Sequence, residues 1–149
     1  MKSMYLRLLA MAVLSFISMY VLMYMMVDRY NDVYPNLNQF YMAGMMTAPM
    51  IVFEMLLMGS MYKNKMVNLV IIVLGVIVLA LFVLFIRKQT AISDSEFLKS
   101  MIPHHGGAVL MCTENEIEDA EIKDLCKEIV SSQESEISWM KQKLAEMKK

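Results

Sequence analysis

The chain has 149 residues, of which 58% are hydrophobic, and its mean hydropathy of +0.47 is too high for an ordinary soluble domain of this size. Its 14 lysines and arginines against 15 aspartates and glutamates give a net charge of −1, which argues against a nucleic-acid-binding protein. Two cysteines exclude a disulfide framework but permit one bridge or two metal thiolates. The 19 methionines exceed what a hydrophobic core needs as filler.

Three long apolar segments follow one another at about residues 8–27, 38–62 and 66–86. A helix of about 20 residues crosses the roughly 30 Å hydrocarbon core of a bilayer. We therefore predict an all-α chain in which residues 1–88 form a membrane domain of three transmembrane helices. The first segment is long and lacks a small-residue cleavage site, which favours a membrane span over a cleaved signal peptide.

The cations that flank these segments predict the orientation of the chain. Lys2 and Arg7 precede the first segment, and Lys63 and Lys65 lie between the second and third. Because cytoplasmic loops are enriched in lysine and arginine, the N-terminus is predicted in the cytoplasm and the C-terminal tail outside it. Arg87 and Lys88, at the end of the third segment, oppose this assignment, so the excess of flanking cations on the predicted cytoplasmic side is small.

The methionines are distributed unevenly among the three apolar segments. Residues 38–62 hold seven of them, whereas residues 67–86 hold none. Thioethers are soft ligands that prefer Cu(I) or Ag(I), and a carboxylate within a bilayer is a functional candidate by default. The first two segments therefore carry a possible membrane metal face, with ordinary packing as the alternative, at Met19, Met23, Met26, Met42, Met46, Met50, Glu54 and Met58.

Residues 89–149 are charged and predict a soluble antiparallel hairpin of two helices. The first helix begins with a capping box formed by Ser93 and Glu96, runs to about Thr113 and carries Pro103 near its middle, where a kink is expected. The second is expected from about residue 119 to 147. The predicted contact face of the first helix comprises Phe97, Met101, His104, His105, Ala108, Met111 and Cys112.

Antiparallel pairing brings soft metal ligands of the two helices together. Cys112 then faces Cys126, His105 faces Gln133, and Met101 lies close to Met140. The candidate ligands are Met101, His104, His105, Met111, Met140, Cys112 and Cys126, and Gln133 or Glu136 would orient a ligating imidazole. The two cysteines have two readings, a disulfide or a pair of Cu(I) thiolates, and the sequence does not choose between them.

The pattern from Phe97 through Met101-Ile-Pro-His-His105 to Met111, followed by Gln133, Glu136 and Met140, resembles the domain of unknown function 305 family over residues 94–145. The resemblance implies a bacterial, ferritin-like helical fold associated with copper binding and tolerance. It also implies a Cu(I) or Ag(I) site at Met101, His104, His105, Met111 and Met140. This chain differs in Gly106-Gly107, where glutamine is common, and in its two cysteines. Its apolar segments indicate a membrane-anchored branch, in the bacterial inner membrane.

A single hairpin is half of a four-helix bundle and cannot bury its apolar stripe alone. We expect a homodimer, or packing of the hairpin against the membrane helices.

The leading hypothesis is a membrane-anchored protein that sequesters or transfers Cu(I) for copper tolerance or homeostasis, with a copper donor or acceptor protein as a possible partner. One alternative is a non-catalytic structural or interaction subunit of a membrane complex. A ferritin-like di-iron oxidase is disfavoured because Met101 and Ile102, rather than glutamates, stand three residues before the two histidines. No nucleophile–base arrangement is visible, so we do not predict an enzyme.

Overall fold

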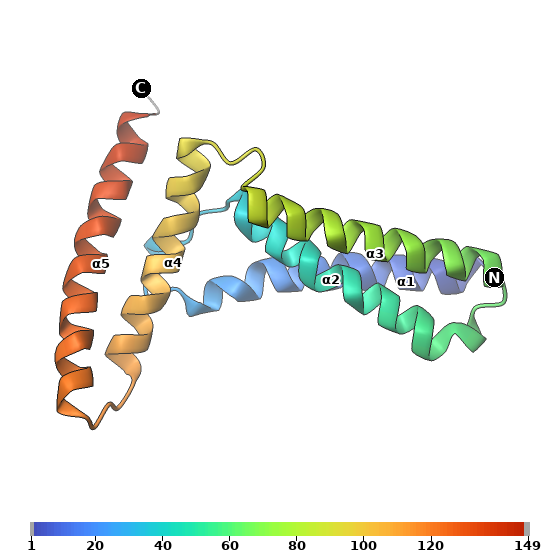
Figure 1. Cartoon of the computed structure of the whole chain (residues 1–149), viewed down its shortest axis with the longest axis horizontal. Coiled ribbons are helices and arrows are strands. Elements are labelled where there is room, and N and C mark those ends of the chain that lie inside the picture. The colour runs from blue at the N-terminus through green and yellow to red at the C-terminus, as the bar shows by residue number, and fades with distance from the viewer. Residues whose placement is uncertain (1, 148–149) are drawn as a thin grey trace. The chain divides into compact units, whose positions relative to one another are not determined.

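The structure is a computed structural model that describes residues 2–147, and these residues form helices joined by short 3-10 turns, with no strand among them (Figure 1). The prediction of an all-α chain is therefore confirmed. The helices are α1 (Lys2–Leu22), α2 (Leu37–Met58), α3 (Lys65–Lys88), α4 (Asp94–Glu114) and α5 (Ala120–Glu146). The 3-10 turns are η1 (Met23–Met26), η2 (Tyr30–Asp32) and η3 (Gly59–Met61).

The helices are divided between two compact units. The apolar unit comprises Met1–Met23 and Asn38–Ala91, and the C-terminal unit comprises Tyr24–Leu37 and Ile92–Lys149. The C-terminal unit therefore contains the predicted hairpin together with the connection between α1 and α2. The sequence pattern predicts this connection only as a loop between two membrane segments.

The apolar unit contains three segments that are long and apolar enough to cross a membrane. They run over Met4–Met26, Leu37–Met61 and Lys65–Lys88, with mean hydropathies of 2.1, 1.5 and 3.6. Many of their large hydrophobic side chains are exposed, on α3 above all. Such exposure is costly in water but not in lipid.

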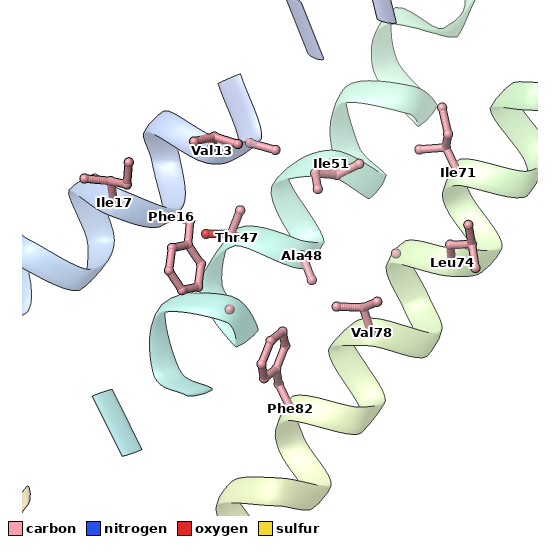
Figure 2. Close-up of a pocket in the computed structure, with 13 residues that line it drawn as sticks. Val13, Phe16, Ile17, Thr47, Ala48, Ile51, Ile71, Leu74, Val78 and Phe82 are labelled. Atoms are coloured by element: carbon pink, nitrogen blue, oxygen red, sulfur yellow. The ribbon is translucent and has the colours of Figure 1, made fainter. Parts of the chain in front are cut away.

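Small residues allow α2 and α3 to approach each other closely. A Cβ atom at Gly44 would lie 2.4 Å from a ring carbon of Phe82, and one at Gly75 would lie 2.8 Å from a methyl carbon of Val52. Close backbone approach at small residues is typical of helix pairs in membranes. Beside this contact, α1, α2 and α3 line an open apolar groove of about 430 Å³ (Figure 2).

In the C-terminal unit, local signals set the ends of α4 and α5 close to the predicted positions. The Ser93 hydroxyl accepts a hydrogen bond from the backbone N–H of Glu96, and the Asp119 carboxylate caps α5 by accepting from two backbone N–H groups. The helix α4 continues through Pro103. One hydrophobic core joins the two helices at Leu98, Ile102, Val109, Ile137, Met140 and Leu144, with Tyr34, Met101 and Val130 packed against it.

The face of α4 that packs in the core differs from the predicted one. The structure buries Leu98, Ile102 and Val109, whereas Phe97 and Met111 are exposed to 49% and 56%. The two stripes overlap on the helix surface, and the branched aliphatic side chains form the buried one. The sequence pattern could not rank them because the stripe of Phe97 and Met111 is equally periodic.

The connection Tyr24–Leu37 lies against α4 at two adjacent glycines, Gly106 and Gly107, which have no side chains. A Cβ atom at Gly106 would lie 3.2 Å from a methyl carbon of Val27, and one at Gly107 would lie 3.3 Å from the carbonyl oxygen of Met26. The two glycines therefore leave the space that the connection occupies. Larger residues here would force the connection away from the helix.

Candidate metal site

The two adjacent histidines have different surroundings. His105 is 8% exposed, while the neighbouring His104 is exposed to solvent. Their ring centroids are 6.1 Å apart and the ring planes are inclined by 63°. Successive residues of a helix point about 100° apart. The pair therefore presents one imidazole to the interior and one to the outside.

Both ring nitrogens of His105 lie close to oxygen atoms. The Nδ1 atom is 2.9 Å from the carbonyl oxygen of Met101, and the Nε2 atom is 2.7 Å from Oε2 of Glu136. A carbonyl oxygen can only accept, so Nδ1 donates to Met101, and Nε2 lies within hydrogen-bond distance of the Glu136 carboxylate. A metal ligand needs a free nitrogen lone pair, which His105 gains only by losing one of these contacts. In this arrangement His105 ties α4 to α5 through Glu136.

Among residues 2–147, no oxygen atom forms such a contact with His104, and a thioether stands one helical turn before it. Residues three apart lie on the same helix face, so Met101 and His104 are neighbours on α4. Met101 packs against the core cluster that contains Met140 of α5. Met101 therefore lies beside the core that holds Met140, and His104 stands on the exposed side of the same turn of α4.

Met111 lies on the exposed side of α4 and Gln133 is half-buried on α5. Within the part of the chain that the structure describes, neither residue is hydrogen-bonded to a histidine, and Glu136 rather than Gln133 pairs with His105. Antiparallel pairing had set Gln133 opposite His105. The actual partner lies one helical turn further along α5.

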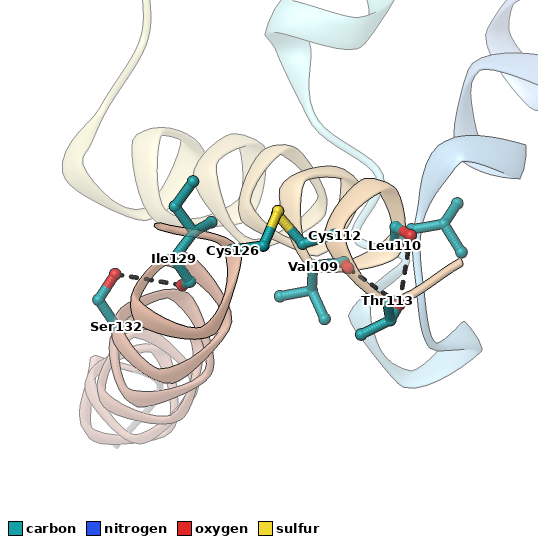
Figure 3. Close-up of a disulfide and its surroundings, with 7 residues drawn as sticks. All are labelled: Val109, Leu110, Cys112, Thr113, Cys126, Ile129 and Ser132. Atoms are coloured by element: carbon teal, nitrogen blue, oxygen red, sulfur yellow. Dashed lines mark hydrogen bonds between the residues drawn. A yellow bond between two sulfur atoms is a disulfide. The ribbon is translucent and has the colours of Figure 1, made fainter. Parts of the chain in front are cut away.

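Cys112 and Cys126 form a disulfide that joins α4 to α5, with their Cα atoms 5.2 Å apart (Figure 3). The prediction that these two residues face each other is confirmed. Of the two readings left open by the sequence, the structure has the disulfide. In this state the two sulfurs are not available as thiolate ligands.

The proposed membrane metal face spreads over several environments. Met19, Met23, Met42 and Met50 are half-buried, and Met26, Met46 and Met58 are exposed. The buried methionine of α2 is instead Met55, which clusters with Leu8 and Tyr62. The Glu54 carboxylate accepts a hydrogen bond of 3.0 Å from the Tyr62 hydroxyl, which gives it a structural partner within the apolar unit.

Among the residues that the structure describes, no three His, Cys, Asp or Glu side chains form a group that could hold a metal ion. Methionine thioethers are a further class of donor. A site in this chain would therefore have to combine an imidazole with methionine sulfur, a donor set that suits Cu(I) or Ag(I) rather than a hard cation.

Two ion pairs that the sequence analysis did not anticipate attach the connection to α5. Arg29 pairs with Glu134 at 2.5 Å, and the buried carboxylate of Asp32 pairs with Lys141. Together with Asp28 and Ser138, these residues line one side of a pocket of about 220 Å³, which Val109 and Ile137 also line. The partners are more than 100 residues apart in the chain, so no local pattern could have revealed them.

Residues 85–144 match a family described as a domain of unknown function (DUF305). An uncharacterized protein of Acanthamoeba polyphaga mimivirus is 35% identical over 143 residues, which cover 94% of this chain and 92% of that protein. No solved structure matches the chain. The similarity to the viral protein thus extends over the apolar helices as well as the matched domain.

Proposed function

The chain belongs to the DUF305 family, and from this premise we propose that it is a membrane-anchored protein that binds Cu(I) or Ag(I) and sequesters or transfers it in copper tolerance or homeostasis. The family description states no activity, so the proposal rests on the side chains of this chain. The metal is cargo in this proposal, and no catalytic step is assigned.

One observation carries the proposal. An exposed imidazole stands one helical turn from a thioether, and this thioether packs against a hydrophobic core that contains a second thioether. These groups are His104, Met101 and Met140. Imidazole and thioether donors together select soft monovalent ions over Mg²⁺, Ca²⁺ or Zn²⁺. His104 is the first ligand in this scheme because His105 is held by Met101 and Glu136.

Anchoring in a membrane is supported by the three apolar segments. Lipid would cover side chains such as Leu74 and Leu84, which are 54% and 49% exposed. The methionines of α1 and α2 are secondary candidates for a path along which Cu(I) moves. We propose a bacterial-type inner membrane, with the C-terminal unit on the extracytoplasmic side.

A second copy of the chain is the proposed partner of the C-terminal unit. The connection Tyr24–Leu37 covers one part of the hairpin, but Phe97, Met111, Ile122 and Leu125 stay exposed. Two hairpins would complete a four-helix bundle and bury these residues. Light scattering of the detergent-solubilised chain measures the oligomeric state, and a monomer would contradict this part of the proposal.

The test of copper binding is a Cu(I) titration of the full chain in detergent against a competing chelator. We expect Met101→Leu and His104→Ala each to weaken binding by at least about tenfold, because each removes a donor. His105→Gln should weaken it less and should lower the melting temperature instead, because it breaks the contact with Glu136.

Met147→Leu is the matched control, since this exposed methionine lies at the far end of α5 and should leave binding unchanged. The absence of Cu(I) binding by the unmodified chain would refute the proposal. Binding that survives the combined Met101→Leu and His104→Ala change, measured with the Cys112–Cys126 disulfide intact, would also refute it.

A further inference from the structure

We propose that Cys112 and Cys126 form a second, redox-gated Cu(I) site, closed in the disulfide state and opened when a small thiol reduces the bridge. The inference rests on the proposed copper function but uses different ligands, namely thiolates in place of imidazole and thioether. It therefore adds a condition under which the chain takes up more metal.

The disulfide lies outside the hydrophobic core of the hairpin. The buried residues of α4 all precede Cys112, and the buried residues of α5 all follow Cys126. None of the described residues from 110 to 136 is buried. Breaking the bridge therefore does not expose the core. The reduced hairpin keeps its packing at Ile102 and Met140, and the two cysteines stay opposite each other.

The backbone spacing suits one ion held by both sulfurs. The two Cα atoms are 5.2 Å apart. Metal–thiolate bonds of about 2.3 Å require sulfurs no more than about 4.6 Å apart, and rotation about the Cα–Cβ bonds can reach this separation. Cu(I) accepts two thiolates, so no further protein ligand is needed.

The bridge is open to attack because both cysteines line a groove of about 540 Å³, walled also by Lys123, Lys127 and Glu134. Glu134 is paired with Arg29, and Lys127 is paired with Asp124. Lys123 makes no ion pair among the described residues, so its charge is left to attract an approaching thiolate anion.

Reduction is ordinary thiol–disulfide exchange. A thiolate of the reductant bonds to one cysteine sulfur, the sulfur–sulfur bond breaks, and the other cysteine leaves as a thiolate. A second reductant thiolate attacks the mixed disulfide and releases the remaining cysteine. Two electrons pass to the protein, the reductant ends as its own disulfide, and Cu(I) takes the place of the thiol protons.

The experiment compares oxidised chain with chain reduced by dithiothreitol and freed of reductant without oxygen. Free thiols and bound Cu(I) are counted in both. We expect reduction to add two thiols and one equivalent of Cu(I), and the combined Cys112→Ser and Cys126→Ser variant to add neither. A reduced chain that gains no equivalent, or a serine variant that still gains one, would overturn the inference. So would a bridge that resists reduction in the folded chain.

The same titration separates this inference from the proposed function. If the oxidised chain binds no Cu(I) and the reduced chain binds one equivalent, the imidazole–thioether site fails and the dithiolate site stands. Lys123→Glu should slow reduction by glutathione by at least about threefold and should slow reduction by dithiothreitol less, because the thiolate form of glutathione carries more negative charge than that of dithiothreitol. Lys143→Glu, a change of a lysine paired with Glu146 outside the groove, is the matched control. Equal slowing by both changes would overturn the role of Lys123.

Discussion

Asp32 is 3% exposed, and its carboxylate pairs with the ammonium group of Lys141 on α5. A charge removed from water in this way is tolerated because an opposite charge accompanies it. At the scale of single residues, the connection is thus held to the hairpin by this ion pair, whose carboxylate is buried, as well as by contacts with the bare backbone at Gly106.

Lys141→Met should destabilise the C-terminal unit by about 3 kcal/mol, because it leaves the Asp32 carboxylate buried without a countercharge. Adding Asp32→Asn should recover most of this loss, since no charge then remains buried. Thermal unfolding of the full chain in detergent, followed by circular dichroism, measures both effects. Lys127→Met, which breaks an exposed pair, is the control and should cost less than about 0.5 kcal/mol. Equal costs at the two lysines would contradict the argument.

At the scale of elements, the start of α4 is hydrogen-bonded to the connection Tyr24–Leu37 as well as capped by Ser93. Glu96 was predicted to complete a capping box with Ser93. Its carboxylate instead accepts hydrogen bonds from the backbone N–H of Leu37 at 2.9 Å and from the ammonium of Lys99 at 2.7 Å. Burial by itself would raise the pKa of Glu96, but these two bonds and the Lys99 charge outweigh it and hold the pKa below its ordinary value of 4.5.

The lowered pKa of Glu96 predicts a pH dependence of stability. The group binds protons more weakly in the folded chain, so its stabilising contribution is complete above about pH 4.5 and is lost as the pH falls through the lowered pKa. Glu96→Gln should cost about 1–2 kcal/mol at pH 7 and should reduce the loss of melting temperature on acidification. Glu121→Gln, in the exposed first turn of α5, should change neither. An unaltered pH profile in Glu96→Gln would contradict this assignment.

At the scale of the whole molecule, the C-terminal unit restricts how the chain can cross a membrane. It contains both the connection Tyr24–Leu37 and the tail from Ile92 onward, so the two segments must lie in one compartment. They are separated by α2 and α3. Either both of these helices span the membrane or neither does, and their mean hydropathies of 1.5 and 3.6 favour spanning.

Single cysteines introduced at Asn31 and Ser135 in the Cys112→Ser and Cys126→Ser background should react with an impermeant maleimide from the same side of a sealed vesicle. A cysteine at Lys63, between α2 and α3, should react only from the opposite side. Vesicles of the two orientations provide the comparison, and detergent-permeabilised vesicles show the full labelling of each position. Labelling of Asn31 and Lys63 from one side would rule out the three-helix membrane topology.

The sequence by itself determined the helical class, the approximate ends of α2, α3, α4 and α5, the cap at Ser93, and the opposition of Cys112 and Cys126. These follow from apolar run length, local hydrogen-bonding residues and the geometry of an antiparallel pair, all of which act over short distances in the chain. The motif of the tail also predicted the family.

Only the tertiary structure decided which face of α4 is buried, which histidine is held by Glu136, and that the connection Tyr24–Leu37 belongs to the C-terminal unit. Each of these depends on partners far apart in sequence, such as Arg29 and Glu134, which are separated by 105 positions. Local periodicity carries no information on such contacts. They form because burial of a particular set of aliphatic side chains and pairing of buried charges lower the free energy of the whole unit together.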